Sequence, residues 1–130
     1  MKRSVVISVV LVLSLIIGIS SALAVEVTLF GPKQYVRTSG SPDVFADTFV
    51  GVPGQGTLIV KNGNYDGGHR VEDGVSSATM SVNGLEIFGP NDFNQNVYYL
   101  ETTVDLIEDN TVDITLASAL GSYITVEVTE

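Results

Sequence analysis

The 130-residue chain contains no cysteine and no tryptophan. Without cysteine it can have no disulfide, no thiol catalysis, no Cys-ligated zinc or iron–sulfur centre, and no lipidated N-terminal cysteine of the lipoprotein type. Without tryptophan, any sugar site would lack the most common stacking side chain. A disulfide-stapled scaffold and a thiol enzyme are therefore both excluded.

Basic residues are also scarce. Residues 25–130 hold four Lys and Arg side chains against 15 Asp and Glu, a formal charge of −11. Such a surface repels phosphate backbones and anionic lipid. We therefore expect neither a nucleic-acid nor a membrane-surface partner, and the charge itself is typical of a protein kept soluble outside the cell.

The N-terminal segment has the pattern of an export signal. Lys2 and Arg3 precede an apolar run over residues 5–19, and Ala22-Leu23-Ala24 is a small-x-small cleavage box. An uncleaved anchor begins in the same way, but a bilayer span needs about 20 apolar residues. We expect a signal peptide over residues 1–24, one domain over 25–130, and an exported product, periplasmic or extracellular.

Apolar residues after position 25 recur with a period of two. Three segments, 78–82, 111–116 and 124–129, alternate strictly between apolar and polar side chains. Further candidate strands are residues 25–30, 35–38, 45–50, 57–61, 85–88, 97–100 and 102–106. The alternation predicts that Val82, Ile114, Leu116 and Val126 lie in the core.

Turn signals separate these segments at short intervals. They include Gly31-Pro32, Ser41-Pro42-Asp43, Asn62-Gly63, Gly89-Pro90, Asp109-Asn110 and Gly121-Ser122. Asn83-Gly84 predicts a two-residue type I′ hairpin, because both residues accept a positive φ. The whole pattern indicates a single all-β antiparallel sandwich with jelly-roll or immunoglobulin-like connectivity.

One glycine-rich loop follows the spacing of a 12-residue calcium loop. Asn62, Asn64 and Asp66 occupy positions 1, 3 and 5, and Asp73 occupies position 12. Position 1 is Asn where Asp is expected, and position 12 is Asp where Glu is expected. Position 9, where a ligand or its water should lie, is the cationic Arg70. A calcium site and a glycine-rich hairpin loop are the two interpretations, and the departures favour the hairpin.

The same loop carries His69, the one histidine of the chain. A catalytic His needs a nucleophile and an orienting carboxylate beside it, and no G-x-S-x-G pattern surrounds Ser76 or Ser77. The 15 acids form many pairs that glycoside hydrolysis could use in principle, which is why no one pair stands out. We expect no enzyme activity and an exposed loop histidine.

A cluster of carboxamides follows Gly89-Pro90. It comprises Asn91, Asp92, Asn94, Gln95 and Asn96, with Tyr98 and Tyr99 next to it. β-Sandwiches that bind sugars combine aromatic platforms with such hydrogen-bonding groups. The alternative is a corner whose Asn and Asp side chains bind the loop's own backbone, as they do in turns, with Phe93 as its anchor in the core.

Two stretches resemble known families. "RVEDGVSSATMSVNGLEIFGPNDFN" and "VDLIEDNTVDITLASALGSYITVEV" are similar to a small uncharacterised β-sandwich domain of exported bacterial proteins. The shorter pattern "ATMSVNGLEI…DLIEDNTVDITL" resembles the galactose-binding-like jelly-roll modules that accompany glycoside hydrolases. That second resemblance implies a ligand site in loops at one end of the sandwich, and neither supplies catalytic residues.

Together these patterns predict a non-catalytic, monomeric or weakly self-associating module of the cell envelope or the outside, acting structurally or by binding another protein. The alternative is a carbohydrate-binding module with its site at Asn91, Asp92, Asn94, Gln95 and Tyr99. No cofactor is expected, apart from calcium if Asn62, Asn64, Asp66 and Asp73 bind it.

Overall fold

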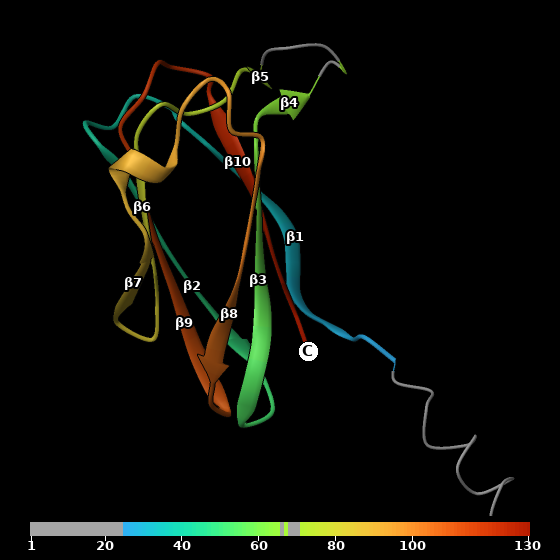
Figure 1. Cartoon of the computed structure of the whole chain (residues 1–130). Helices are drawn as coiled ribbons and strands as arrows, with labels where there is room; N and C mark the ends of the chain where they lie inside the picture. The colour runs from blue at the N-terminus through green and yellow to red at the C-terminus, as the bar shows by residue number, and fades with distance from the viewer. Residues whose placement is uncertain (1–24, 66, 68–70) are drawn as a thin grey trace, which may run out of the picture.

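The chain folds into two packed antiparallel sheets, as the computed structural model in Figure 1 shows; it describes residues 25–65, 67 and 71–130. Its long strands are β1 (Thr28–Val36), β2 (Asp43–Val50), β3 (Gly54–Asn62), β6 (Ala78–Val82), β7 (Leu85–Phe88), β8 (Tyr99–Leu106), β9 (Asp109–Leu116) and β10 (Tyr123–Thr129). A short hairpin, β4 (Asn64–Tyr65) with β5 (Val71–Glu72), and a 3-10 turn, η1 (Pro90–Asp92), complete the described elements. The expected all-β sandwich is confirmed.

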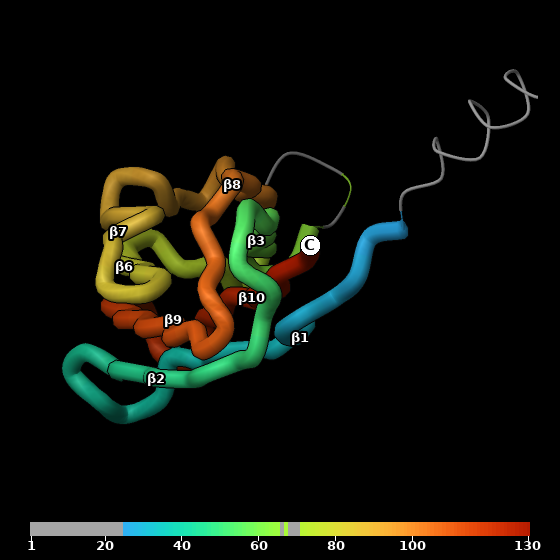
Figure 2. Tube along the Cα trace, turned by 90° about the horizontal axis from the view of Figure 1, so that it is seen from below, coloured from blue at the N-terminus to red at the C-terminus, as the bar shows by residue number. Residues whose placement is uncertain are grey.

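The strand order decides between the two predicted connectivities. Sheet A has the order β1-β10-β3-β8, and sheet B has the order β2-β9-β6-β7. Figure 2 looks along the strands and shows β3, β8 and β10 in one layer and β6, β7 and β9 in the other. Among the long strands only β6 and β7 are consecutive neighbours, and every other connection crosses between sheets, which is the double Greek key of a jelly roll.

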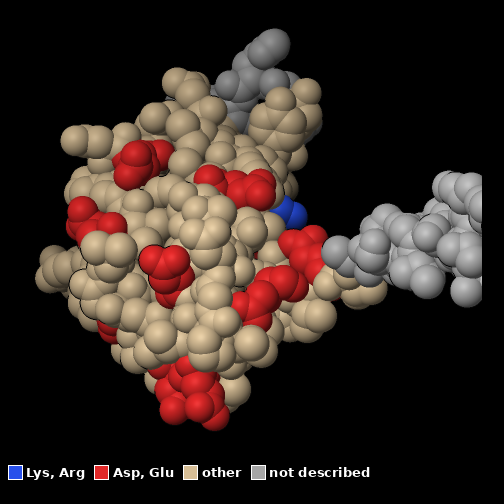
Figure 3. Space-filling model, turned by 60° about the horizontal axis from the view of Figure 1, so that its bottom comes forward, with Lys and Arg blue, Asp and Glu red and all other residues tan. Residues whose placement is uncertain are grey.

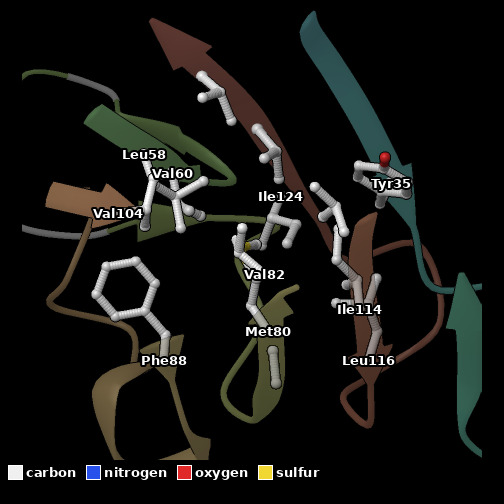
Figure 4. Close-up of a cluster of buried hydrophobic side chains, with 14 of the residues drawn as sticks. Tyr35, Leu58, Val60, Met80, Val82, Phe88, Val104, Ile114, Leu116 and Ile124 are labelled. Carbon is white, nitrogen blue, oxygen red and sulfur yellow. The ribbon is translucent and has the colours of Figure 1, made fainter. Parts of the chain in front are cut away.

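The core lies between the two sheets, as Figure 4 shows. Inward residues of β3 and β10, such as Leu58 and Ile124, meet inward residues of β6 and β9, such as Met80 and Ile114, and all four are fully buried. The predicted core residues Val82, Ile114, Leu116 and Val126 are at most 3% exposed. Strand alternation therefore predicted the inner faces correctly.

The β6–β7 hairpin turns where the sequence predicted. Asn83 and Gly84 have φ values of 52° and 81°, as a type I′ turn requires. The Asn83 side chain accepts from Thr111 N (2.9 Å) and donates to Asn110 Oδ1 (2.9 Å). The turn is thus tied to the neighbouring strand β9.

Two predicted turns were wrong. Gly31-Pro32 lies inside β1, where the register with β10 shifts, so parts of the two predicted strands, 25–30 and 35–38, join in one irregular strand. Asp109-Asn110 begins β9, and the chain turns earlier, at residues 107–108. Asn110 is fully buried and its side chain accepts from Ile107 N (2.9 Å) and donates to Ile107 O (2.7 Å), so it closes the turn from inside the strand.

The predicted signal peptide over residues 1–24 lies outside the described residues. Within the described part of the chain, no helix is long and apolar enough to cross a membrane.

Candidate functional site

The carboxamide corner after β7 is anchored by Phe93, which is 2% exposed and meets Phe88 edge to face at 6.4 Å between ring centroids. Asp92 Oδ2 accepts from Gly89 N (2.8 Å), and Asn94 Oδ1 accepts from Asn96 N (2.8 Å). These two side chains therefore hold the loop's own backbone, as the alternative interpretation of the corner predicted.

The remaining polar side chains of the corner are exposed. Asn91, Gln95 and Asn96 lie at the surface, and the backbone carbonyl of Gln95 accepts from Val71 N (3.0 Å). That bond ties the corner to the β4–β5 hairpin. Several hydrogen bonds thus hold the backbone of the corner, and no hydrogen bond within the described residues uses the side-chain amides of Asn91, Gln95 and Asn96.

Asn62, at the end of β3, fastens the corner to the sheet. Its fully buried side chain accepts from Val75 N (2.7 Å) and donates to Val75 O (3.0 Å) and Val97 O (3.1 Å). A weaker contact reaches Asn94 O at 3.3 Å. The sequence pattern pointed to Asn62 as a metal ligand and missed this role.

These contacts bear on the predicted calcium loop. The Asn62 amide is already committed to backbone groups, whereas Asn64 and Asp73 are exposed and Asp73 has a φ of 57°. Asp66, His69 and Arg70 lie outside the described residues. Among the described residues no three His, Cys, Asp or Glu side chains are grouped to hold a metal ion, and calcium binding stays a prediction that Asn62, as placed, does not support.

An aromatic pair stands beside the corner. Tyr65 in β4 stacks on Tyr98, with ring centroids 5.4 Å apart and planes inclined by 24°. Tyr65 is 50% exposed and Tyr98 is half-buried. In Figure 1 the segment that follows η1 runs toward β4 before it enters β8, which explains how two tyrosines distant in sequence meet.

Tyr65 is the site residue that sequence reasoning missed. It lies in the loop whose spacing suggested calcium, and nothing in that spacing points to Tyr98. The contact depends on the two-residue pairing of β4 with β5 and on the bond between Val71 and Gln95. Two-residue strands carry too little alternation to be recognised in a sequence.

Tyr99 begins β8 and belongs to the outer face of sheet A. It is 47% exposed, pairs in register with Lys61, and donates its hydroxyl to Glu101 Oε2 (2.8 Å). The hydrogen bond to Glu101 raises the pKa of Tyr99, with a smaller contribution from partial burial. Tyr99 thus presents a protonated phenol beside a carboxylate.

A cleft of about 530 Å³ opens at the β1 edge of sheet A, opposite β8, where the edge strands β1 and β2 face each other. Its polar and aromatic lining comprises Lys33, Gln34, Tyr35, Thr38, Phe45 and Asp47. We call it the β1/β2 cleft. None of the predicted site residues lines it.

The floor of the β1/β2 cleft is a linked set of charged and aromatic groups. Asp47 Oδ2 accepts from Lys33 Nζ (2.7 Å) and from the Tyr35 hydroxyl (2.5 Å). Lys33 Nζ also lies 5.2 Å from the Tyr35 ring centroid, and Phe45 packs against that ring at 5.2 Å. This arrangement fixes both rings and the carboxylate.

Protonation in the cleft follows from these contacts. The hydrogen bonds from Lys33 and then Tyr35 lower the pKa of Asp47. Burial, followed by the Asp47 carboxylate, raises the pKa of Tyr35 well above its usual value. Near neutral pH the Asp47 carboxyl is therefore ionised and the Tyr35 phenol is neutral.

Asp43 holds the turn between β1 and β2, which borders the cleft at Thr38. Its carboxylate accepts from Arg37 Nη1 (2.7 Å), Thr38 N (2.6 Å) and Gly40 N (3.1 Å). Desolvation alone would raise the pKa of Asp43, but the hydrogen bonds from Arg37, Thr38 and Gly40 outweigh it and lower the pKa. The turn between β1 and β2 is thus stapled in one shape.

No protein-family profile matches the chain, and no curated protein sequence does. Similar solved structures include a family 35 carbohydrate binding module from Clostridium thermocellum, with 14% identity and a TM-score of 0.42 over 82% of this chain and 98% of that one. A second, from Paenibacillus barcinonensis, gives 14% identity and a TM-score of 0.38 over 79% of this chain and 98% of that one.

A different kind of protein also matches. Dimeric latent PorU from Porphyromonas gingivalis has 15% identity and a TM-score of 0.35, over 81% of this chain and 12% of PorU. Identities and TM-scores at this level assign no family.

Proposed function

We propose that this chain is an exported, non-catalytic carbohydrate-binding module whose site is the carboxamide corner together with the Tyr65–Tyr98 pair. The observation that carries the proposal is that stacked pair, half exposed, with the exposed amide side chains of Gln95 and Asn96 immediately before Tyr98 in the chain. It provides the aromatic surface that the missing tryptophan would otherwise have supplied.

The chemistry of the corner suits a sugar. The C–H face of a pyranose packs on an aromatic ring, and carboxamides both donate to and accept from hydroxyl groups. A backbone fixed by Asp92, Asn94 and the buried Phe93 holds these groups in place before binding, which lowers the entropic cost of association. The acidic surface does not repel an uncharged glycan.

A glycan array followed by calorimetry tests this function. We expect Tyr98→Ala and Tyr65→Ala each to weaken glycan binding about tenfold through lost aromatic contact. Tyr65→Phe keeps the ring and is expected to lose less affinity than Tyr65→Ala. Val50→Ala, an exposed change at the opposite end of the sandwich, is the control for general surface effects.

Thermal unfolding of each variant separates lost binding from lost folding. A flat array, or a folded Tyr98→Ala protein that binds its glycan with unchanged affinity, would contradict the proposal. A flat array would leave the structural or protein-interaction role that the sequence also suggested.

A further inference from the structure

We propose that the β1/β2 cleft is a second subsite for the same glycan, joined to the corner by a row of side chains across the outer face of sheet A. This inference rests on the proposed function. It adds the direction in which the glycan lies, the length of chain that binds best, and the class of glycan.

The connecting row follows from strand register. Tyr99 pairs with Lys61, Lys61 with Thr125, and Thr125 with Gln34, one residue from each strand of sheet A. Tyr99, Lys61 and Gln34 are exposed and Thr125 is half-buried. The row starts at the corner and ends at Gln34, which lines the cleft.

The row sets the length of the ligand. Neighbouring strands lie about 4.8 Å apart, so the four residues span roughly 14 Å across the sheet. One sugar unit cannot cover that span, whereas a chain of several units can. The glycan would lie across the strands, with hydroxyl groups over Lys61 and Thr125.

The cleft has hydrogen-bonding capacity left for a ligand. Lys33 and Tyr35 both bond to Oδ2 of Asp47, and no hydrogen bond within the described residues uses its Oδ1. No hydrogen bond within the described residues uses the Gln34 amide either, and the Lys33 ammonium has two further N–H groups. With Phe45 and Tyr35 beside them, these groups give the mixture of apolar and convergent polar surface that small polar ligands bind.

The neighbouring row selects the charge of the glycan. Glu101 and Glu127 flank Ile59 in the next row of the same outer face, so two carboxylates lie along one side of the proposed path. They disfavour an anionic glycan through repulsion and desolvation. We therefore infer an uncharged, hydroxyl-rich polysaccharide rather than a uronic-acid or sulfated one.

Titration calorimetry with oligosaccharides of increasing length tests the second subsite. The probes are neutral cello-, xylo- and manno-oligosaccharides of one to six units, with oligogalacturonides as the charged series. Affinity for the neutral series that binds is expected to rise about tenfold between the shortest binding oligomer and the hexamer. Oligogalacturonides are expected to bind more weakly at every length.

Two variants in the cleft test whether the increase in affinity with oligosaccharide length arises there. Gln34→Ala, and Ala46→Arg at the exposed rim of the cleft, are expected to abolish the gain with length and leave the shortest binding oligomer unaffected. Gln55→Ala is the matched control, because Gln55 lies on the same face but pairs with Asp105, three rows away from the proposed path. It should leave all affinities unchanged.

The outcomes separate this inference from the proposed function. Affinity that depends on Tyr98 but not on oligomer length, or a hexamer affinity unaffected by Gln34→Ala and Ala46→Arg, overturns the second subsite alone. Tighter binding of oligogalacturonides overturns the inferred class of glycan. The failure of every oligosaccharide and polysaccharide to bind overturns the proposed function and this inference with it.

Discussion

At the scale of single residues, Asn62 distinguishes two interpretations of the same loop. If Asn62 is a calcium ligand at position 1, replacing it with Asp, the residue that this position normally holds, should strengthen calcium binding. If Asn62 instead holds the backbone, the same replacement should destabilise the fold, because a carboxylate cannot donate hydrogen bonds to the carbonyls of Val75 and Val97. We expect Asn62→Asp to lower the free energy of unfolding by about 2–4 kcal/mol, measured by urea denaturation with and without calcium.

Asn64→Asp is the control for that experiment, since Asn64 is exposed at position 3 of the same pattern. It should change the unfolding free energy by no more than about 0.5 kcal/mol. Calcium-dependent stabilisation of both Asp variants would contradict the staple and restore the metal site. The sequence could not decide between these roles, because Asn serves equally well as an oxygen ligand and as a turn staple, and only the fold brings residues 75 and 97 to its amide.

At the scale of an element, β1 depends on one glycine. Gly31 has a φ of +76°, and a Cβ added there would lie 2.2 Å from the carbonyl oxygen of Val126 in β10. Gly121 has a similar φ of +87°, but a Cβ there would meet nothing within 4 Å. The two positions therefore share the left-handed backbone and differ in the clash.

Substituting each glycine by alanine should separate the two effects. Gly121→Ala carries the left-handed penalty alone, about 1–2 kcal/mol. Gly31→Ala must also push β1 away from β10, so we expect it to cost at least about 2 kcal/mol more, as overpacking does. Hydrogen exchange should localise the loss to β1 and β10, and equal unfolding free energies for the two variants would contradict the clash.

The elements also show where sequence reasoning succeeds. Alternation identified the inner faces of β6, β9 and β10, and Asn-Gly placed the β6–β7 turn, because both signals are local. Gly31-Pro32 has the composition of a turn but forms an irregularity inside β1, and Asp109-Asn110 starts a strand. In both cases pairing with a distant strand overrode the local signal. The contact between Tyr65 and Tyr98 had no local signal at all, because it joins two loops that are distant in sequence.

At the scale of the whole molecule, the connectivity follows from pairings between strands distant in sequence. Ten candidate segments with period-two patterns suit a jelly roll and an immunoglobulin-like sandwich equally well. The arrangement of β1 beside β10 and of β2 beside β9 decides the matter. The same crossing of strands creates the β1/β2 cleft between two sheet edges, so no local pattern could have predicted it.

The charge of the whole molecule gives the last prediction. Figure 3 shows acidic side chains scattered over one face, with basic side chains visible at a single small spot. Two ion pairs, Lys33–Asp47 and Arg37–Asp43, occur among the described residues. Most carboxylates are therefore unpaired by Lys or Arg there, and their mutual repulsion is stronger in the compact folded state than in the expanded unfolded chain.

Salt should therefore stabilise this protein. Raising sodium chloride from 10 to 150 mM shortens the screening length from about 30 Å to about 8 Å, and we expect the melting temperature at pH 7 to rise. A triple variant at exposed acids, Glu86→Gln, Glu108→Gln and Asp113→Asn, should melt higher at low salt and respond less to added salt. A salt response equal to that of the natural protein would show that these charges do not destabilise the fold, because removing three of the repelling carboxylates must weaken any effect that arises from them.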